Sequence, residues 1–208
     1  MATVITPRIR EYSSESNGIV MTPREFDRAE FVDGWRYELI NEVLVVTPFS
    51  LINERDPNEE LGHWLRNYQD GHPQGAALDA TVHEQTIVTQ SNRRRADRVI
   101  WAGLGRLPRK KEKPTIIVEF VSAGRRDRKR DYETKRDEYL QLGVREYWVF
   151  DRFQHTLTVF TASKGKAKKQ VLRETQTYQT DLLPGFKLPV ARLVALANRW
   201  PDDESLTD

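Results

Sequence analysis

Apolar residues fall along the chain in short patterned runs that predict both helices and strands. Leu61, Trp64, Leu65 and Tyr68 recur at helical spacing, which predicts a helix over residues 56–69. The run Thr115–Val121 (TIIVEFV) is apolar on both faces, as is typical of a central strand in a sheet. The pattern also predicts helices over 22–32, 130–142 and 189–200, a hairpin over 37–46, and strands over 80–88, 97–101, 145–151 and 156–161.

Local signals mark several ends of these elements. The segment 22–25 (TPRE) combines a capping threonine, a proline at the first helical position and a glutamate three residues after the cap. Asn41 and Glu42 form the expected bend of the hairpin. Gly143 is expected to end the helix before it. The lysine-rich segment 164–169 lacks periodicity and is predicted to be a basic loop.

The order of these elements predicts one architecture. A helix and antiparallel strands, followed by a strand–helix–strand unit, indicate a mixed α/β domain with a central mixed β-sheet flanked by helices. Residues 1–20 are polar, serine-rich and aperiodic, so we expect a flexible N-terminal segment there. The single domain is expected to span 21–200, with a C-terminal tail over 201–208.

Composition removes several classes of protein. The 208 residues include no cysteine, which excludes disulfide scaffolds, zinc fingers, iron–sulfur sites and cysteine nucleophiles. No apolar run approaches the roughly 18 residues of a membrane span, and the first 18 residues contain no apolar signal core. We therefore expect a soluble, cytoplasmic protein that does not associate with membranes.

The charges are unevenly distributed, although the net charge is only +2. Between Arg93 and Arg136 there are 16 Lys and Arg residues against 6 Asp and Glu, whereas the rest of the chain has 17 basic and 25 acidic residues. A stretch that binds a polyanion is one interpretation of this asymmetry. A set of solvated surface charges is the other, and the chemistry within the stretch has to decide between them.

Two carboxylates in this stretch suggest a metal site. Glu119 interrupts an otherwise apolar strand, where an uncompensated carboxylate is costly to bury. Asp97 begins the preceding strand, so the two acids converge if these strands are neighbours. Like charges in one place repel, and a divalent cation is the usual remedy. Oxygen ligands without cysteine or nearby histidine favour a hard ion, either Mg²⁺ or Mn²⁺.

The following helix supplies a possible cationic partner. Asp131, Lys135 and Tyr139 are spaced four apart and therefore share one helical face. The turn before this helix is short, so its lysine could reach the end of the Glu119 strand and stabilise charge on a phosphate. The alternative is an exposed Asp131–Lys135 ion pair that contributes less than about 1 kcal/mol. Asp97 and Glu119, which lie in the same basic segment, favour the site.

Several segments occur in an order that resembles a known family. They are YELI at 37–40, RAD at 95–97, VEFVS at 118–122, Asp131 with Lys135, and GVREYWV at 143–149. Over about residues 21–200 the chain resembles the Uma family, putative restriction endonucleases of the PD-(D/E)XK nuclease superfamily. The resemblance implies a restriction-endonuclease-like fold and metal-dependent hydrolysis of DNA.

The resemblance also implies roles for individual residues. Asp97 and Glu119 would be the metal ligands, and Glu38 the additional acidic residue near the metal, with Glu42 as an alternative across the hairpin bend. The superfamily's usual lysine position is occupied by Val121, which points to Lys135 on the following helix. The chain departs from the family pattern twice: Ala96 replaces the proline before the first aspartate, and residues 53–58 lack the usual histidine.

The leading hypothesis is therefore a Mg²⁺-dependent DNA endonuclease with Asp97, Glu119, Lys135 and Glu38 at its site. Because cutting both strands of a duplex requires two sites, a homodimer is expected. The alternatives are a non-catalytic nucleic-acid-binding module on a degenerate nuclease fold, and an interaction protein whose charge run is merely solvated. The basic residues expected to follow the phosphate backbone are Arg93, Arg94, Arg125, Arg126, Arg128, Lys129 and Arg130.

Overall fold

A computed structural model of the chain describes residues 11–124, 128–163 and 167–201. Its contacts divide the chain into two compact units. The smaller unit extends to Phe49 and also includes Thr86–Arg95, whereas the larger unit comprises Ser50–Gln85 and the chain from Ala96 onward.

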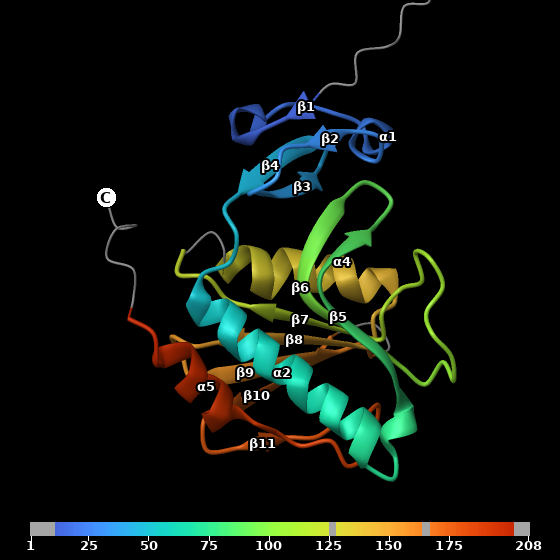
Figure 1. Cartoon of the computed structure of the whole chain (residues 1–208), viewed down its shortest axis with the longest axis vertical. Helices are drawn as coiled ribbons and strands as arrows, with labels where there is room; N and C mark the ends of the chain where they lie inside the picture. The colour runs from blue at the N-terminus through green and yellow to red at the C-terminus, as the bar shows by residue number, and fades with distance from the viewer. Residues whose placement is uncertain (1–10, 125–127, 164–166, 202–208) are drawn as a thin grey trace, which may run out of the picture. The chain divides into compact units, whose positions relative to one another are not determined.

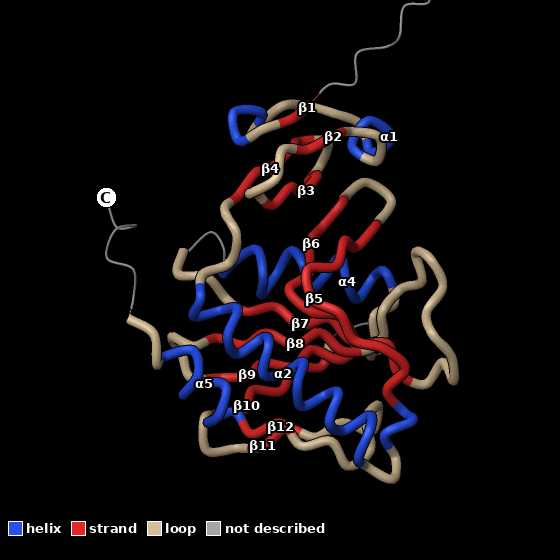
Figure 2. The backbone as a smooth tube through the Cα atoms, in the orientation of Figure 1, coloured by secondary structure: helices blue, strands red, loops and turns tan. Residues whose placement is uncertain are grey.

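The strands form the mixed sheet that the sequence predicts. The strand order is β10-β9-β8-β7-β6-β3-β4, and β5 also pairs with β6 (Figures 1 and 2). Strands β7 and β8 are parallel, whereas the ladders β6–β7, β8–β9 and β9–β10 are antiparallel. The expected fold class, a mixed α/β protein with a central mixed sheet flanked by helices, is confirmed. The bounds are β3 Arg36–Ile40, β4 Val43–Thr47, β5 Leu78–Val88, β6 Arg93–Ala102, β7 Ile116–Phe120, β8 Glu146–Asp151, β9 Thr156–Thr161 and β10 Lys168–Arg173.

In the larger unit, one face of the sheet packs against α2 and α5 and the other face contacts α4. Helices α2 (Ile52–Gly71) and α5 (Val190–Asn198) lie together on one face and bury apolar side chains of β7, β8 and β9 (Figure 1). Helix α4 (Lys135–Leu142) contacts β8, where the ring of Tyr139 packs against that of Tyr147. Because side chains alternate along a strand, Glu119 lies on the face opposite to Val118 and Phe120. The remaining elements are η2 (Gly75–Ala77), the π-helical turn η3 (Arg130–Thr134), β11 (Thr177–Tyr178) and β12 (Leu188–Pro189).

The smaller unit is built around the β3–β4 hairpin. Its turn residues Asn41 and Glu42 have φ angles of 49° and 63°, as the expected tight bend requires. Short strands β1 (Glu11–Tyr12) and β2 (Glu30–Phe31) pair in parallel beside it. Residues Tyr12, Met21, Tyr37, Leu39 and Leu44 form its core. The unit also contains η1 (Ser14–Ser16) and α1 (Pro23–Phe26).

Several boundaries differ from the prediction, and the strand expected over 97–101 begins at Arg93, so Asp97 lies within it rather than at its start. The helix expected over 22–32 ends at Phe26, although its capping box forms as expected, because β2 follows and Phe31 stacks on Tyr37 with ring centroids 4.4 Å apart. Helix α2 begins at Ile52 rather than at residue 56 and continues through Pro57. The predicted basic loop over 164–169 is wrong at Lys168 and Lys169, which begin the edge strand β10.

The terminal segments of the expected domain plan overlap the described residues only in part. Residues 11–20 include β1 and η1, whereas residues 1–10 and 202–208 lie outside the described chain. The division at residues 21 and 200 remains a prediction. In the part of the chain that the structure describes, no helix combines the length and the apolar character needed to cross a bilayer.

Candidate active site

The ladder between β6 and β7 brings the two predicted carboxylates onto neighbouring strands. Arg98 pairs with Val118 and Val99 with Ile117, and one further step of this register aligns Asp97 with Glu119. Residues directly opposite in an antiparallel pair point to the same face. The regular pairing ends at Arg98, and Oδ2 of Asp97 accepts a hydrogen bond from the backbone nitrogen of Phe120 at 2.8 Å. The Asp97 carboxylate therefore replaces a main-chain acceptor at the point where the strands separate.

Glu119 is a buried acid with two different donors. Its side chain is 2% exposed; Nζ of Lys135 lies 2.8 Å from Oε2, and the Tyr139 hydroxyl donates to Oε1 at 3.0 Å. Burial raises the pKa of the Glu119 carboxyl, and nearby Asp97 and Asp131 raise it further, whereas Lys135 opposes the shift. The cost of burying this carboxylate is thus offset by direct contacts from one helix.

Lys135 links two carboxylates. Besides Glu119, its Nζ contacts Oδ1 of Asp131 at 3.2 Å, the i,i+4 pair expected from the spacing. This pair is buried rather than exposed, since both side chains are less than 5% accessible. Two other cationic residues near Lys135 in the sequence could be considered for its role, but Lys129 is exposed and Arg136 is paired with Asp137 at 2.7 Å.

A π-helical turn precedes Lys135. The backbone N–H of Lys135 bonds to the carbonyl of Arg130, five residues earlier, rather than four as in an α-helix. Such one-turn expansions are frequent at functional sites. Within this turn, the carbonyl oxygen of Asp131 accepts a hydrogen bond from the Tyr147 hydroxyl of β8 at 2.9 Å. Burial, together with nearby Glu119 and Asp131, raises the pKa of Tyr147, so its phenol stays protonated and can donate.

Asp97 is held from the other side by α2. The Asn58 side-chain nitrogen donates to the Asp97 carbonyl at 2.9 Å, and Nε of Arg98 donates to Oδ1 of Asn58 at 2.6 Å. All three side chains are buried. Asn58 was not predicted from the sequence, since a single asparagine in a helix gives no signal of its partner. Tyr139 had a signal, its spacing from Lys135, but its contact with Glu119 was not predicted.

The donor chemistry of this cluster fits a hard divalent cation. Asp97 and Glu119 present only oxygen ligands, which Mg²⁺ and Mn²⁺ prefer. Among the described residues, no group of three His, Asp or Glu side chains forms a candidate metal cluster. Two carboxylates are nevertheless sufficient for Mg²⁺, which commonly binds one or two and completes its shell with water and substrate phosphate.

Glu38 and Glu42 have different positions in the smaller unit. Glu38 lies in β3 and is buried, and its Oε1 accepts a hydrogen bond from the backbone nitrogen of Arg95 at 2.8 Å. Glu42 lies exposed in the turn between β3 and β4. Of the two alternatives, Glu38 is therefore the acid that has a fixed orientation.

The predicted phosphate-binding residues differ in their surroundings. Arg93 is buried and forms a two-point contact with Asp27, with Nε–Oδ1 and Nη2–Oδ2 distances of 2.7 and 2.8 Å. Arg94 is also buried, at 1% exposure. Arg128 contacts Asp151 at 3.1 Å and Arg130 contacts Asp131 at 3.3 Å, whereas Lys129 is exposed. Arg125 and Arg126 lie outside the described residues.

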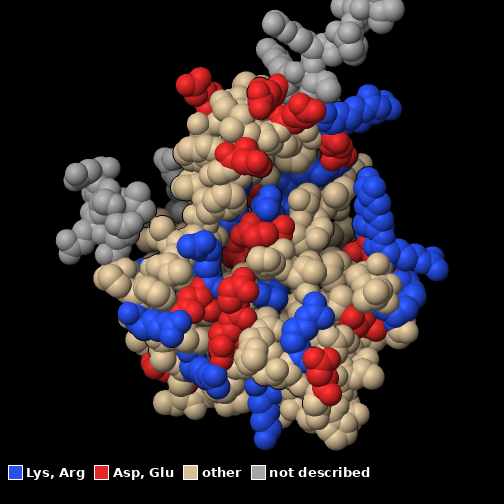
Figure 3. Space-filling model, viewed as in Figure 1, with Lys and Arg blue, Asp and Glu red and all other residues tan. Residues whose placement is uncertain are grey.

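The α2–α5 face of the larger unit has no segregated basic surface. Figure 3 shows acidic and basic side chains interspersed over these helices. Ion pairs between the helices contribute to this mixture, since Arg199 contacts Asp56 at 2.6 Å and Arg192 contacts Glu60. A phosphate-binding surface is therefore not indicated on this face.

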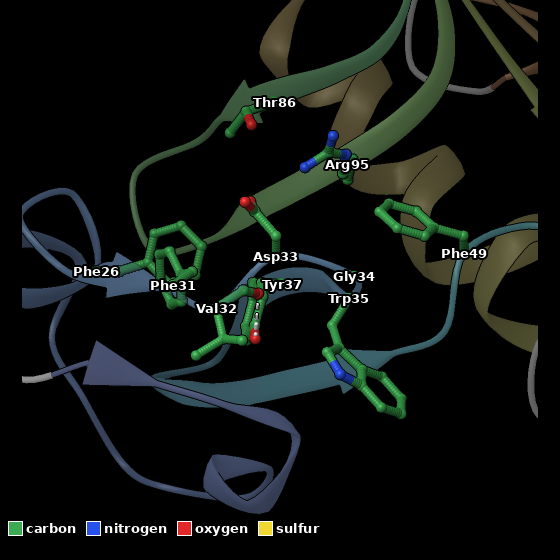
Figure 4. A pocket seen from close by; sticks show the side chains of 10 residues that line it. All are labelled: Phe26, Phe31, Val32, Asp33, Gly34, Trp35, Tyr37, Phe49, Thr86 and Arg95. Carbon is green, nitrogen blue, oxygen red and sulfur yellow. Dashed lines mark hydrogen bonds between the residues drawn. The ribbon is translucent and has the colours of Figure 1, made fainter.

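A separate cavity of about 270 Å³ lies in the smaller unit. Aromatic residues line much of it, and the Asp33 side chain points toward Arg95 across it (Figure 4). Two of these rings, Phe31 and Tyr37, stack on one another and belong to the unit's own core. Among the described residues that line it, Asp33 is the one carboxylate, so the cavity lacks the paired acids of the β6–β7 site.

Comparison with known proteins finds a similar family and a similar fold. The sequence model of the Uma2 family, described as "Putative restriction endonuclease", matches residues 23–191. No curated protein matches the chain. Among solved structures, a putative nuclease belonging to DUF820 from Anabaena variabilis is similar, with a TM-score of 0.67 and 12% sequence identity. The match covers 85% of this chain and 99% of that chain, and at this identity it supports the fold alone.

Proposed function

The chain belongs to the Uma2 family of putative restriction endonucleases, and from this premise we propose that it is a metal-dependent endonuclease that hydrolyses phosphodiester bonds in DNA. One arrangement carries the proposal: Lys135 Nζ lies 2.8 Å from Glu119, and Asp97, one residue beyond the last β6–β7 pair, accepts a hydrogen bond from the backbone nitrogen of Phe120, the residue after Glu119. Two acids and a lysine thus meet at the end of a strand pair, although no two of the three are close in the sequence.

Each residue has a role in the proposed reaction. Asp97 and Glu119 would hold a Mg²⁺ or Mn²⁺ ion, which when bound supplies Lewis acidity that polarises phosphate and lowers the pKa of water. Lys135 would neutralise the charge that develops on the phosphate during attack. Asp131 contacts that ammonium directly, and Tyr139 donates to Glu119, the other carboxylate that the ammonium contacts. Glu38 is proposed as a further acidic residue of the site.

Binding of DNA in this proposal depends on the basic segment around η3. Lys129 is exposed, and Arg128 and Arg130 are partly exposed beside it, so these three can reach phosphates most readily. Arg125 and Arg126 remain part of the proposed set. We leave out Arg93 and Arg94 because both are buried and Arg93 is neutralised by Asp27. We also propose a homodimer, because cleavage of both strands requires two sites.

Plasmid cleavage in the presence and absence of Mg²⁺ tests the proposal. The wild-type protein is expected to nick supercoiled DNA only with the ion, and Asp97→Asn and Glu119→Gln are each expected to abolish nicking. Added Mg²⁺ should also raise the melting temperature of the wild type but not of either variant, because a ligand stabilises only a fold that binds it. Equal thermal shifts in all three proteins would contradict the metal site.

A second candidate is a non-catalytic nucleic-acid-binding module on the same fold. The observation that favours it is the mutual saturation of the cluster: both oxygens of Glu119 already have donors, and Glu119, Lys135 and Asp131 are all buried. Such a network can have a purely structural role, in which the buried charges only neutralise one another. This candidate predicts retention of DNA at low salt without Mg²⁺-dependent nicking, whereas a protein whose charge run is merely solvated would retain no DNA.

A further inference from the structure

Two buried tyrosines direct their hydroxyls at the Glu119–Lys135 cluster, and the proposed reaction uses neither as a reacting group. Tyr139 on α4 donates to Oε1 of Glu119 at 3.0 Å. Tyr147 on β8 donates to the backbone oxygen of Asp131 at 2.9 Å. Both rings are fully buried and pack edge to face, with centroids 5.3 Å apart.

Tyr139 restricts the orientation of the Glu119 carboxylate. The terminal torsion of a glutamate is broad and roughly two-fold, so one donor on one oxygen leaves the carboxylate free to swing. Here Lys135 contacts Oε2 while Tyr139 contacts Oε1, and the two donors come from adjacent turns of one helix. Together they define the plane in which Glu119 would present an oxygen to a cation.

Tyr147 acts one step further from Glu119, through the π-helical turn. The turn makes an i→i+5 hydrogen bond between Arg130 and Lys135, so it needs support from its surroundings. The Tyr147 hydroxyl supplies a bond from β8 to the Asp131 carbonyl inside that turn. Asp131 in turn contacts Lys135 Nζ at 3.2 Å. Tyr147 is therefore connected to the lysine, whereas Tyr139 is connected to the acid.

We infer that Tyr139 and Tyr147 are positioning residues: Tyr139 orients the proposed metal ligand Glu119, and Tyr147 orients Lys135 by holding η3. This inference rests on the proposed nuclease function. Outer groups that hydrogen-bond to metal ligands typically change metal affinity or activity by about 10- to 100-fold when they are removed. The two hydroxyls should consequently affect different steps.

The experiment compares three Tyr→Phe variants, each of which removes one hydroxyl and keeps the ring. Tyr139→Phe is expected to weaken Mg²⁺ binding by the protein, measured calorimetrically without DNA, and to lower kcat by about 10- to 100-fold. Tyr147→Phe is expected to lower kcat while Mg²⁺ affinity stays within a few-fold. In both variants the KM for plasmid should be unchanged, since both tyrosines are buried and their hydroxyls are bonded within the protein.

The matched control is Tyr132→Phe. Tyr132 lies in the same π-helical turn, and its hydroxyl lies 3.4 Å from the carboxylate of Asp151, outside the cluster. Loss of the Tyr132 hydroxyl tests whether removal of any phenol–carboxylate contact at η3 has the same effect as loss of the Tyr139 or Tyr147 hydroxyl. We expect wild-type Mg²⁺ affinity and wild-type kcat for this variant.

Three results would overturn the inference. The first is a folded Tyr139→Phe protein that has wild-type Mg²⁺ affinity and kcat. The second is a lower melting temperature without any change in kcat or Mg²⁺ affinity, which would indicate a structural role. If Tyr139→Phe fails to fold, Tyr147→Phe decides, and a wild-type kcat there is the third. A wild-type protein that neither binds Mg²⁺ nor cleaves would instead reject the proposed function, together with the inference that rests on it.

Discussion

Glu119 shows how a single polar residue in an apolar strand constrains everything packed against it. A carboxylate at 2% exposure has to be paired, because desolvation of an isolated charge costs several kcal/mol. Lys135 and Tyr139 provide that pairing from one helical face, and Asp131 completes the environment of the lysine. The contacts that make the acid tolerable in the core therefore also give it a fixed orientation.

Removal of the lysine tests this arrangement most directly. In Lys135→Met, cleavage is expected to fall by a factor on the order of 100 or more, because a donor to developing charge is lost. Glu119 and Asp131 would lose a buried cationic partner, so the free energy of unfolding should fall by roughly 3–5 kcal/mol. Urea denaturation and plasmid cleavage measure the two effects.

Lys129→Met is the matched control for Lys135→Met. Lys129 is an exposed lysine six residues earlier, so its replacement should change the free energy of unfolding by no more than about 0.5 kcal/mol. Cleavage by Lys135→Met at the wild-type rate, with a defect in Arg136→Met instead, would show that the lysine is wrongly assigned.

At the scale of secondary-structure elements, the β3–β4 turn departs from its ideal sequence. Asn41 and Glu42 both have positive φ, the geometry that favours Asn-Gly, yet a glutamate occupies the second position. Glu42→Gly should therefore raise the free energy of unfolding, by about 0.5–1 kcal/mol, because glycine adopts this conformation without strain. Thermal denaturation measures the gain. Loss of cleavage in this variant would show that Glu42, rather than Glu38, belongs to the site.

At the end of α4, by contrast, a glycine already occupies the position that requires a positive φ. Gly143 caps the helix in the left-handed conformation, with φ at 92°. Gly143→Ala should destabilise the protein by about 1 kcal/mol or more, because a Cβ is strained at this φ. Gly71→Ala is the control, since Gly71 is the last residue of α2, has no positive φ, and has open space where the alanine methyl group would lie. Equal denaturation midpoints for the two variants would contradict the strain argument.

At the scale of the whole molecule, the basic segment predicts how DNA binding responds to salt. Each phosphate contact contributes about 0.9 to the slope of log affinity against log salt concentration. Replacing Arg128, Lys129 and Arg130 together by glutamine should therefore reduce the slope by about 2.7 if all three contact phosphates. Fluorescence anisotropy with a duplex at several salt concentrations measures the slope.

Arg192→Gln is the control for the salt experiment. Arg192 is an exposed arginine of α5 and is paired with Glu60, on the face that shows no segregated basic surface. Its replacement should leave the slope unchanged. A slope that is the same in the triple variant as in the wild type would remove the segment around η3 from the DNA interface.

Features that depend on neighbouring residues could be predicted from the sequence. The capping box at Thr22, the bend at Asn41 and Glu42, the end of α4 at Gly143 and the apolar strand around Glu119 all form as expected, because each depends on φ preferences or periodicity within a few residues. The i,i+4 relation of Asp131 and Lys135 is of the same kind. The sequence by itself thus determined the main strands and the helical face that supplies Lys135.

Only the tertiary structure decided which groups meet across the fold. The local sequence shows Arg93 only as one of a run of basic residues, yet Asp27, 66 residues away in the chain, neutralises its charge. Spacing places Tyr139 on the face of Lys135, but the packing of α4 against the sheet directs its hydroxyl to Glu119. Similarly, Asn58 reaches Asp97 from a distant helix. Such pairings depend on how elements pack and which polar groups must be satisfied once buried, and neither is encoded in local propensity.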